Sequence, residues 1–461
     1  MIGSNITTIT TIVALATPPG RSGIGVIRLS GPEASQYATT LISRASVSRP
    51  TLQHTFLPGR AQLFKLRSPE DGEFLDHAII TYFKAPKSFT GEDVIEISCH
   101  GAPVILDQLI GILLRLGART AEPGEFTLRA VRNGRMNLTQ AEAIRDLIEA
   151  RTGTAARQAQ RQLKGELSGD LQSIKSRLLE IIVPLESALE FVEDDLPEIK
   201  LNEFAASTHQ LRKKIDELAA TFHSGRLLKD GLKVAFAGRP NVGKSSLFNA
   251  LLLKDRAIVT NYPGTTRDSL NESVNINGVP IVFTDTAGLR SSSDEIESLG
   301  VERARRAIFD SDLVLVVIDG SQPLTAEDQS VLADITDTPH IIIINKKDLG
   351  RAVDRIGTPE AETSAVSGEG IDELKGVILD LAGATNINDG SYLITNARHR
   401  DLLLRTSNEL LESEQLLESK ASEEVVLIGL YNALKYLGQI TGETTSEDVL
   451  TQIFTTFCIG K

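Results

Sequence analysis

The chain has 461 residues, 41% of them hydrophobic and 24% charged, with a formal net charge of −13. This acidic balance argues against a broad basic face for tight, nonspecific nucleic-acid binding. Two cysteines without a C-x-x-C spacing argue against a disulfide framework or structural zinc and suit a reducing, cytoplasmic setting. No apolar run approaches about 18 residues and no basic start precedes an apolar segment, so neither a membrane span nor a signal peptide is expected.

Short β-like runs alternate with turns over residues 1–122, which predicts a compact α/β domain at the N-terminus. The expected strands are residues 11–16, 25–29, 77–83 and 94–98, with a helix over residues 107–116.

Residues 123–229 change to a pattern of long helices. Leucine and isoleucine recur at steps of three and four from Leu163 to Leu185, which predicts an apolar stripe on one long helix. Pro184 is expected to kink or interrupt this helix. A further helix is expected over residues 203–229.

Three arginines follow the start of this helical region at intervals of three residues: Arg129, Arg132 and Arg135. On a helix they would share one face and form a local basic patch. A solvated charged face is the favoured interpretation of this spacing.

Residues 230–383 alternate strand and helix, which is typical of a doubly wound nucleotide-binding domain. A strand over residues 233–237 leads into Gly238-Arg-Pro-Asn-Val-Gly-Lys-Ser-Ser246, which fits G-x-x-x-x-G-K-[ST]. Backbone N–H groups of such a loop surround phosphate oxygens, the lysine reaches the β- and γ-phosphates, and the serine binds Mg²⁺. The residues expected to bind nucleotide here are Asn241, Val242, Gly243, Lys244, Ser245 and Ser246.

Two further segments are expected to sense the γ-phosphate. Asp285-Thr286-Ala287-Gly288 follows an apolar run at residues 279–283, where the carboxylate meets the Mg²⁺ shell and the Gly288 N–H meets the phosphate. Gly264-Thr265-Thr266-Arg267-Asp268 supplies the mobile threonine that closes on Mg²⁺ and the γ-phosphate.

The base is expected to be guanine. Asn345-Lys346-Lys347-Asp348 follows a buried-looking strand at residues 340–344, and Asp348 can accept from guanine N1–H and the exocyclic amine. Adenine would leave that carboxylate unpaired, which a polar site penalises strongly. The backbone of Ser364-Ala365 can contact guanine O6. These elements in this order predict a guanine-nucleotide domain of the small GTPase type.

Helical periodicity resumes after residue 383 and continues through residues 384–461. The simplest arrangement inserts the GTPase domain into a helical domain built from both flanks. The expected fold is therefore multidomain α/β plus all-α: an N-terminal α/β domain, a helical domain and an inserted P-loop GTPase domain.

Two positions bear on hydrolysis. Leu289 stands where many small GTPases carry the glutamine that orients water, so the water must be handled otherwise. Carboxylates within residues 290–297 could do so, although a solvated acidic loop is the simpler interpretation. Asn241 could bind a monovalent cation or could be a loop residue that tolerates unusual φ and ψ, and its residue type leaves both open.

Several longer motifs carry a resemblance that covers essentially the full chain. They occupy residues 17–28, 89–96, 123–127 and 137–144, and the chain ends in Cys458-Ile459-Gly460-Lys461. Together with the GTPase signatures, they make the chain resemble the tRNA modification GTPases of the MnmE (TrmE) family.

The resemblance implies an N-terminal domain that binds a formyl-tetrahydrofolate-type one-carbon donor and forms a homodimer. By motif position, Arg28, Glu96, Arg135 and Lys461 would contact the folate. Arg135 stands where relatives often have lysine, which keeps the charge and changes the geometry.

The resemblance also implies K⁺-stimulated GTPase domains that pair face to face across their nucleotides. Glu297 would then position or activate the attacking water. Tyr262 replaces a commonly aliphatic residue, which matters little if it contributes a backbone carbonyl. The implied ligands are Asn241, Thr260, Tyr262 and Thr265 for K⁺, and Ser245 and Thr266 for Mg²⁺.

The implied reaction involves an FAD-dependent partner, in a heterotetramer, that helps add an aminomethyl or carboxymethylaminomethyl group to C5 of the wobble uridine of certain tRNAs. GTP hydrolysis would drive a conformational cycle rather than the carbon chemistry. Cys458 could attack uridine C6 or relay a one-carbon unit, but no neighbouring base or helix N-terminus activates it, so a packing role is favoured.

Two alternatives use the same GTPase motifs. A ribosome-assembly GTPase switch should carry a basic RNA-binding module, whereas this chain carries the folate-like module and the Cys-Ile-Gly-Lys end. A membrane-remodelling GTPase should show a basic amphipathic face, which the sequence lacks.

Overall fold

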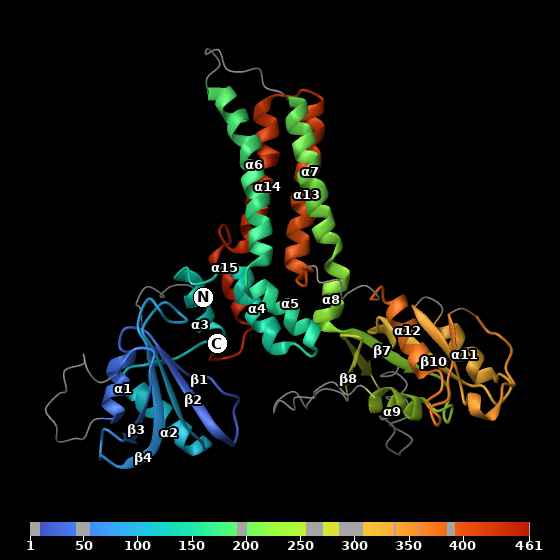
Figure 1. Ribbon diagram of the computed structural model, residues 1–461, viewed down its shortest axis with the longest axis horizontal. Coiled ribbons are helices and arrows are strands. Elements are labelled where there is room, and N and C mark those ends of the chain that lie inside the picture. The colour runs from blue at the N-terminus through green and yellow to red at the C-terminus, as the bar shows by residue number, and fades with distance from the viewer. Residues whose placement is uncertain are drawn as a thin grey trace. The chain divides into compact units, whose positions relative to one another are not determined.

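A computed structural model describes residues 10–42, 56–190, 201–254, 271–284, 308–335, 338–357, 359–384 and 392–460 (Figure 1). Within these residues the chain forms two compact units. The first unit is built from residues up to Arg145 and from Thr441 onward, and the second spans Asp146 to Ile440.

The first unit contains a six-stranded sheet in the order β3-β4-β5-β2-β1-β6, antiparallel except for the parallel pair β1 and β6. The strands are β1 (Ile12–Leu15), β2 (Ser22–Ser30), β3 (Ala61–Arg67), β4 (Phe74–Phe83), β5 (Val94–Gly101) and β6 (Arg119–Thr120). Two helices, α1 (Ala34–Ile42) and α2 (Pro103–Arg115), pack with this sheet in one apolar core.

Period-2 alternation decides which side chains of β2 and β5 enter that core. Ile27 and Leu29 of β2 and Ile97 of β5 are fully buried with α1 and α2. Arg28 and Glu96 are only partly buried, and they stand directly opposite each other in the β2–β5 register. The alternation thus places two charged side chains together on the sheet face away from the helices.

A second, smaller core joins residues 125–149 to the C-terminal segment. It combines side chains of α3 (Glu125–Arg132), α4 (Leu138–Glu149) and α15 (Glu447–Phe454). Gly124, just before α3, has φ 68°, and a Cβ there would lie 2.7 Å from the Phe454 carbonyl oxygen. Only glycine lets α3 approach the C-terminal segment this closely.

The second unit contains another six-stranded sheet, in the order β12-β11-β10-β7-β9-β8, in which only β8 is antiparallel to its neighbour. Its strands are β7 (Leu232–Ala237), β8 (Asn271–Ile276), β9 (Val279–Thr284), β10 (Leu313–Asp319), β11 (His340–Asn345) and β12 (Glu360–Glu362). Its described helices are α9 (Lys244–Lys254), α11 (Ala326–Asp334) and α12 (Ile371–Leu381).

Successive residues of β10 and β11 enter two different apolar clusters. Leu315 and Val317 pack in one cluster, whereas Val314, Val316 and Ile318 pack in the other. All seven residues of β10 are buried. A parallel sheet covered on both faces is what βαβ crossovers produce, so the predicted doubly wound domain is confirmed.

Helices from both sides of this sheet domain in the sequence form one bundle. Figure 1 shows α6, α7, α13 and α14 running alongside one another, and all four contribute to a single apolar core. The helices are α5 (Gly153–Leu163), α6 (Glu166–Glu190), α7 (Leu201–Ala220), α8 (Phe222–Asp230), α13 (Ala397–Glu418) and α14 (Glu423–Thr441). The GTPase-like domain is therefore inserted into the helical domain, and the predicted fold class is confirmed. Among the helices described, none is long and apolar enough to cross a membrane.

Three details differ from the sequence-based expectations. The helix expected over residues 203–229 is two helices that meet at Thr221, whose hydroxyl accepts from the Ile394 N–H at 2.9 Å. Pro184 lies inside α6 without interrupting it. The helix α1 and the strand β3 were not expected. Most of β3 is exposed or half-buried, so it carries little of the alternation that reveals a strand.

A close approach in α8 generates a stability prediction. A Cβ at Gly225 would lie 2.0 Å from the Ile394 carbonyl oxygen, where backbone must move. We expect Gly225→Ala to lower the free energy of unfolding by about 1–3 kcal/mol, measured by thermal and urea denaturation. The control is Gly169→Ala in α6, where a Cβ meets nothing within 4 Å. That variant should gain about 0.5–1 kcal/mol, and equal behaviour of the two would contradict the packing argument.

Candidate functional site

The loop after β7 has the backbone that the phosphate-binding pattern requires. Gly238 and Gly243 have φ of 137° and 98°, and Asn241 also lies in the left-handed region at 62°. A Cβ at Gly238 would lie 2.3 Å from the Val317 carbonyl oxygen. The loop therefore needs glycine for space as well as for backbone conformation.

The end of this loop presents polar groups at the start of α9. Lys244, the first residue of α9, donates through Nζ to the carbonyl oxygens of Gly238 at 2.7 Å and Arg239 at 2.8 Å. Ser245 and Ser246 are exposed in the first turn of α9, and Asn241 is exposed in the loop. The N–H groups of a helix N-terminus, together with a lysine cation and two hydroxyls, suit a polyphosphate.

One buried amide joins this loop to the expected base-binding segments. Asn345, at the end of β11, is 1% exposed. Its Nδ2 donates to the Val242 carbonyl oxygen at 2.9 Å, and its Oδ1 accepts from the Ala365 N–H at 3.2 Å. A Cβ at Gly243 would lie 2.3 Å from that Nδ2 atom, so the amide fits only against glycine.

The residues expected to recognise guanine lie together. Ser364 donates through Oγ to Asp348 Oδ1 at 2.5 Å, so the two segments meet at the carboxylate. Lys346 has φ 67° and donates through Nζ to Asp319 Oδ2 at 2.7 Å. Burial would raise the pKa of Asp319, but its bonds from Lys346 and Ser321 outweigh burial and lower the pKa. The Lys346 side chain is thereby held beside the recognition loop.

Other expected site residues lie outside the described residues. Two described strands border the segments that carry most of them: β8 begins at Asn271, after the first segment, and β9 ends at Thr284, before the second. The residues concerned are Thr260, Tyr262, Thr265, Thr266, Asp285, Thr286, Ala287, Gly288, Leu289, Glu297 and Lys461.

A second polar cluster lies in the first unit, where β2 and β5 meet the C-terminal segment. Arg28 donates to Glu96 Oε1 through Nη2 at 2.7 Å and Nε at 3.0 Å. Its Nη1 donates to the carbonyl oxygen of Gly460, 432 residues away in the sequence, at 3.0 Å. The guanidinium also lies 6.0 Å from the ring of Phe89 and 5.8 Å from that of Phe126. Arg28 thus brings its own motif together with the motifs at residues 89–96, 123–127 and 458–461.

Two other expected residues border this cluster. Arg135 is exposed and follows the end of α3, so it does not share a helix with Arg129 and Arg132 as expected. A Cβ on Gly91 would lie 3.3 Å from Arg135 Cγ, which places Arg135 beside the loop that carries Phe89. Cys458 is exposed, and its carbonyl oxygen accepts from the Gly124 N–H at 3.3 Å.

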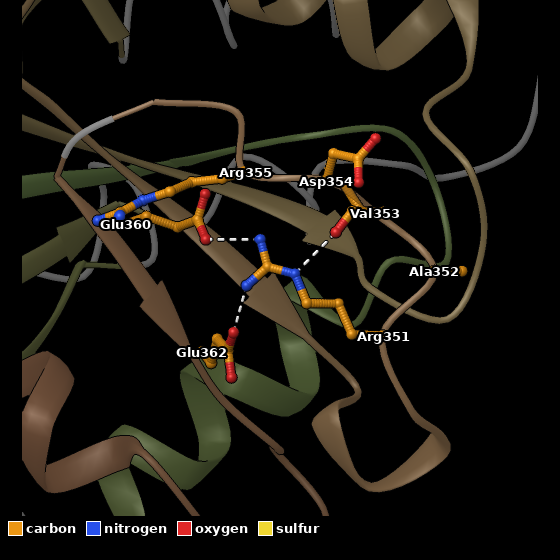
Figure 2. A pocket seen from close by; sticks show the side chains of 7 residues that line it. All are labelled: Arg351, Ala352, Val353, Asp354, Arg355, Glu360 and Glu362. Carbon is orange, nitrogen blue, oxygen red and sulfur yellow. Dashed lines mark hydrogen bonds and ion pairs between the residues drawn. The ribbon is translucent and has the colours of Figure 1, made fainter.

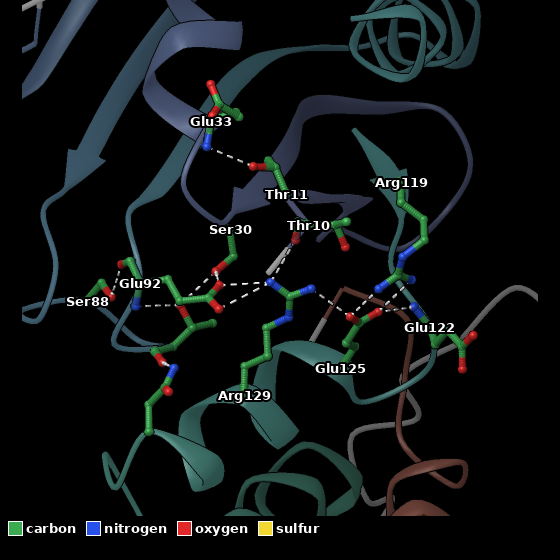
Figure 3. Close-up of polar contacts among 12 residues, drawn as sticks. Thr10, Thr11, Ser30, Glu33, Ser88, Glu92, Arg119, Glu122, Glu125 and Arg129 are labelled. Carbon is green, nitrogen blue, oxygen red and sulfur yellow. Dashed lines mark hydrogen bonds and ion pairs between the residues drawn. The ribbon is translucent and has the colours of Figure 1, made fainter. Parts of the chain in front are cut away.

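The favoured interpretation of Arg129 as part of a solvated face is wrong. Arg129 is 9% exposed and donates to Glu125 Oε1 at 2.9 Å and to Glu92 Oε2 at 3.0 Å (Figure 3). Glu92 also accepts from Ser30 Oγ at 2.7 Å. Glu125 is bonded in turn to Arg119 at 2.5 Å.

This network holds the segment around Phe89 and Glu92 against β2 and α3. Helix spacing alone did not reveal it, because its partners come from three separate segments. The available signal was the motif set itself: Glu92 and Glu125 both lie inside the motifs at residues 89–96 and 123–127.

Comparison with known proteins covers nearly the whole chain. The family model described as MnmE helical domain matches residues 138–458, and the one described as GTP-binding protein TrmE N-terminus matches residues 11–135. The tRNA modification GTPase MnmE of Koribacter versatilis is 45% identical over 454 residues, which cover 98% of this chain and 99% of the relative. The corresponding protein of Aquifex aeolicus is 42% identical over 455 residues, with the same coverage.

The chain belongs to the tRNA modification GTPase family MnmE. Relatives of this identity over nearly their full length confirm the resemblance that the motifs indicated. The chain is a GTP-hydrolysing enzyme.

The buried part of the Arg129 network generates a pH prediction. Burial would raise the pKa of Glu125, but hydrogen bonds from Arg119, the Glu122 N–H and Arg129 outweigh burial and lower it. A lowered folded-state pKa adds stability above the usual value of 4.5 that is lost as pH falls through the folded pKa. We expect the unfolding temperature of the full chain to fall steeply below pH 4.5, and less steeply in Glu125→Gln. The exposed Glu122→Gln is the control and should keep the wild-type slope.

The base-recognition geometry generates a specificity prediction. In Asp348→Asn the amide can donate to O2 of xanthine but cannot accept both guanine donors. We expect the affinity for GDP to fall by about 100-fold or more and xanthosine diphosphate to become the better ligand, measured by calorimetry. Asp354→Asn, an exposed carboxylate further along the same loop, should change neither affinity. A variant of Asp348 that still prefers GDP would remove that residue from base recognition.

Proposed function

We propose that this chain uses GTP hydrolysis to help install an aminomethyl or carboxymethylaminomethyl group at C5 of the wobble uridine of certain tRNAs. The observation that carries the proposal is the cluster of Arg28, Glu96 and Gly460, a second polar site in a different unit from the GTPase motifs. A simple GTP switch has no need of it.

The second site is proposed to bind a formyl-tetrahydrofolate-type donor. Arg28 and Glu96 keep 21% and 28% of their side-chain surface exposed, so a ligand can reach both. Glu96 would accept from N–H donors of a pterin ring, and the nearby rings of Phe89 and Phe126 suit a flat ligand. Arg135 and Lys461 would pair with the glutamate carboxylates of the folate. Bound folate would supply the one-carbon unit.

The GTPase site is proposed to use two cations. Mg²⁺ would be held by Ser245 and Thr266, and K⁺ by Asn241, Thr260, Tyr262 and Thr265. The exposed position and left-handed backbone of Asn241 in the phosphate loop support its role, because an exposed amide oxygen there can coordinate a cation beside a bound phosphate. K⁺ at that place would neutralise charge that develops on the transferred phosphoryl group. Two G domains would pair across their nucleotides within a homodimer.

Glu297 is proposed to position the attacking water. Leu289 has no polar group for this purpose, and Glu297 is the carboxylate that the family resemblance favours. The nucleotide contacts proposed outside the described residues are Thr260, Thr265, Thr266, Asp285, Thr286, Ala287 and Gly288.

The proposed division of labour follows the chain. Residues 1–122 would bind folate and dimerise, residues 123–229 and 384–461 would form the helical domain, and residues 230–383 would bind and hydrolyse GTP. An FAD-dependent partner in a heterotetramer would take part in the carbon chemistry. The net charge of −13 supports a partner that supplies most of the tRNA contacts, in the cytoplasm.

Cys458 is exposed and is proposed not to react. Its thiol has no hydrogen bond to a base among the described residues, and thiolate chemistry needs such activation. The GTP cycle would move the G domains and would not itself make the carbon bonds.

The cation proposal predicts salt-dependent turnover. We expect GTP hydrolysis to be faster in K⁺ than in Na⁺ by roughly tenfold or more, because Na⁺ is too small for a loop of carbonyl oxygens shaped for K⁺. Asn241→Ala should remove the difference. Glu297→Ala should bind GTP and hydrolyse it in neither salt. Equal turnover of the wild type in both salts would eliminate the K⁺ role.

The proposed function is tested on tRNA from cells that lack this chain. The wobble uridine should lose the mass of the C5 substituent, as measured by mass spectrometry of nucleosides, and the wild-type chain should restore it. Arg28→Ala should not restore the mass and should lose 5-formyltetrahydrofolate binding in vitro. Arg60→Ala, an exposed arginine elsewhere in the first unit, is the control. An unchanged wobble nucleoside in the deletion would reject the proposal.

A further inference from the structure

An open pocket of about 730 Å³ lies in the second unit next to β12 (Figure 2). It is lined by residues 351–355 and by Glu360 and Glu362. Arg351 points between the two glutamates: Nη2 donates to Glu360 Oε1 at 2.8 Å, and Nη1 donates to Glu362 Oε1. Its Nε donates to the Val353 carbonyl oxygen at 2.7 Å. All three guanidinium nitrogens of Arg351 therefore donate hydrogen bonds.

These contacts join the two segments that meet at the base site. Arg351 lies three residues after Asp348, and Glu362 lies two residues before Ser364. Asp348 and Ser364 are themselves bonded at 2.5 Å. Arg351 and the Asp348–Ser364 bond thus connect the same loop to the same strand end at two separate points.

The environment makes the Arg351 contacts costly to break. The Glu360 side chain is 7% exposed and also accepts from the Ile356 N–H at 3.1 Å. Without the guanidinium, a nearly buried carboxylate would lose its cation, which is more costly than losing an exposed ion pair. A planar guanidinium can bridge two carboxylates in fixed directions, whereas an ammonium cannot do so in the same geometry.

A contrasting residue lies in the same pocket. Arg355 carries the same charge, lines the same pocket and is exposed, yet it makes no hydrogen bond or ion pair with the described residues. Position in the loop and positive charge alone therefore do not produce the contacts that Arg351 makes.

We propose that Arg351 is a positioning residue for guanine selection. By bridging Glu360 and Glu362, it holds the loop after Asp348 against β12 and so keeps the Asp348 carboxylate in the geometry that two guanine donors require. Arg351 touches no base itself. The inference rests on the proposed role of Asp348.

The readout is the ratio of the affinities for GDP and inosine diphosphate. Hypoxanthine keeps N1–H but lacks the exocyclic amine, so GDP gains over inosine diphosphate only when Asp348 accepts both donors. A displaced carboxylate reduces this gain, whereas a general loss of stability weakens both ligands alike. The ratio therefore separates positioning from a merely structural role.

The experiment measures both dissociation constants by calorimetry for the full chain and for Arg351→Ala, Arg351→Lys and Arg355→Ala. We expect Arg351→Ala to weaken GDP by about tenfold and inosine diphosphate by clearly less, so that the ratio falls. Arg351→Lys should lie closer to the alanine variant than to the wild type. Arg355→Ala should match the wild type. Glu362→Gln, which removes an exposed carboxylate, should shift the ratio in the same direction and guards against misfolding of the arginine variants.

An unchanged ratio in Arg351→Ala would overturn the inference, whether both affinities stay at the wild-type value or fall by the same factor. Asp348→Asn measured in parallel separates the two levels of the argument. If that variant shifts the ratio and Arg351→Ala does not, the positioning role is wrong and guanine recognition stands. If neither shifts the ratio, the assignment of Asp348 fails first.

Discussion

The side-chain amide of Asn345 joins three loops of the GTPase domain at one buried point. It donates to the loop that ends in Lys244 and accepts from the segment that contains Ala365, while its own strand leads into Asp348. An amide can do this because it carries donors and an acceptor on one rigid plane. Gly243 must lack a side chain to admit it. The phosphate-loop segment and the proposed base-recognition segments are therefore tied to one hydrogen-bonded group.

The sheet beneath this point makes the arrangement rigid. The strands β7, β10 and β11 are parallel neighbours with almost entirely buried residues, so their carboxyl ends meet at one edge. The sheet fixes the positions from which the loops at that edge start, as in other open α/β folds. The segments that enter and leave this domain share its apolar core. Leu227 and Leu228 of α8, before the domain, and Leu393, after it, belong to the same buried cluster.

In the first unit, separate segments are joined by a buried charged group instead of an amide. Arg129 lies between two carboxylates and connects α3 to the segment that carries Phe89, next to Arg28. Such a cluster is stable because each buried charge has a partner and further hydrogen bonds. The proposed folate site at Arg28 therefore depends on the hydrogen bonds by which Arg129 holds the neighbouring segment in place. The GTPase site and this site thus rest on separate networks in separate units.

Local sequence determined much of this protein. The phosphate loop, the Asn-Lys-Lys-Asp segment and the apolar stripes are short patterns whose physics acts over a few residues, so the GTPase domain and the helical flanks were predictable. Tertiary structure alone decided the contact between Arg28 and Gly460, the burial of Arg129, the break between α7 and α8, and the bridge made by Arg351. Each of these depends on groups that are far apart in sequence or that approach only in the folded backbone. The free energy of such contacts comes from desolvation and geometry, and a local pattern does not show which groups will meet.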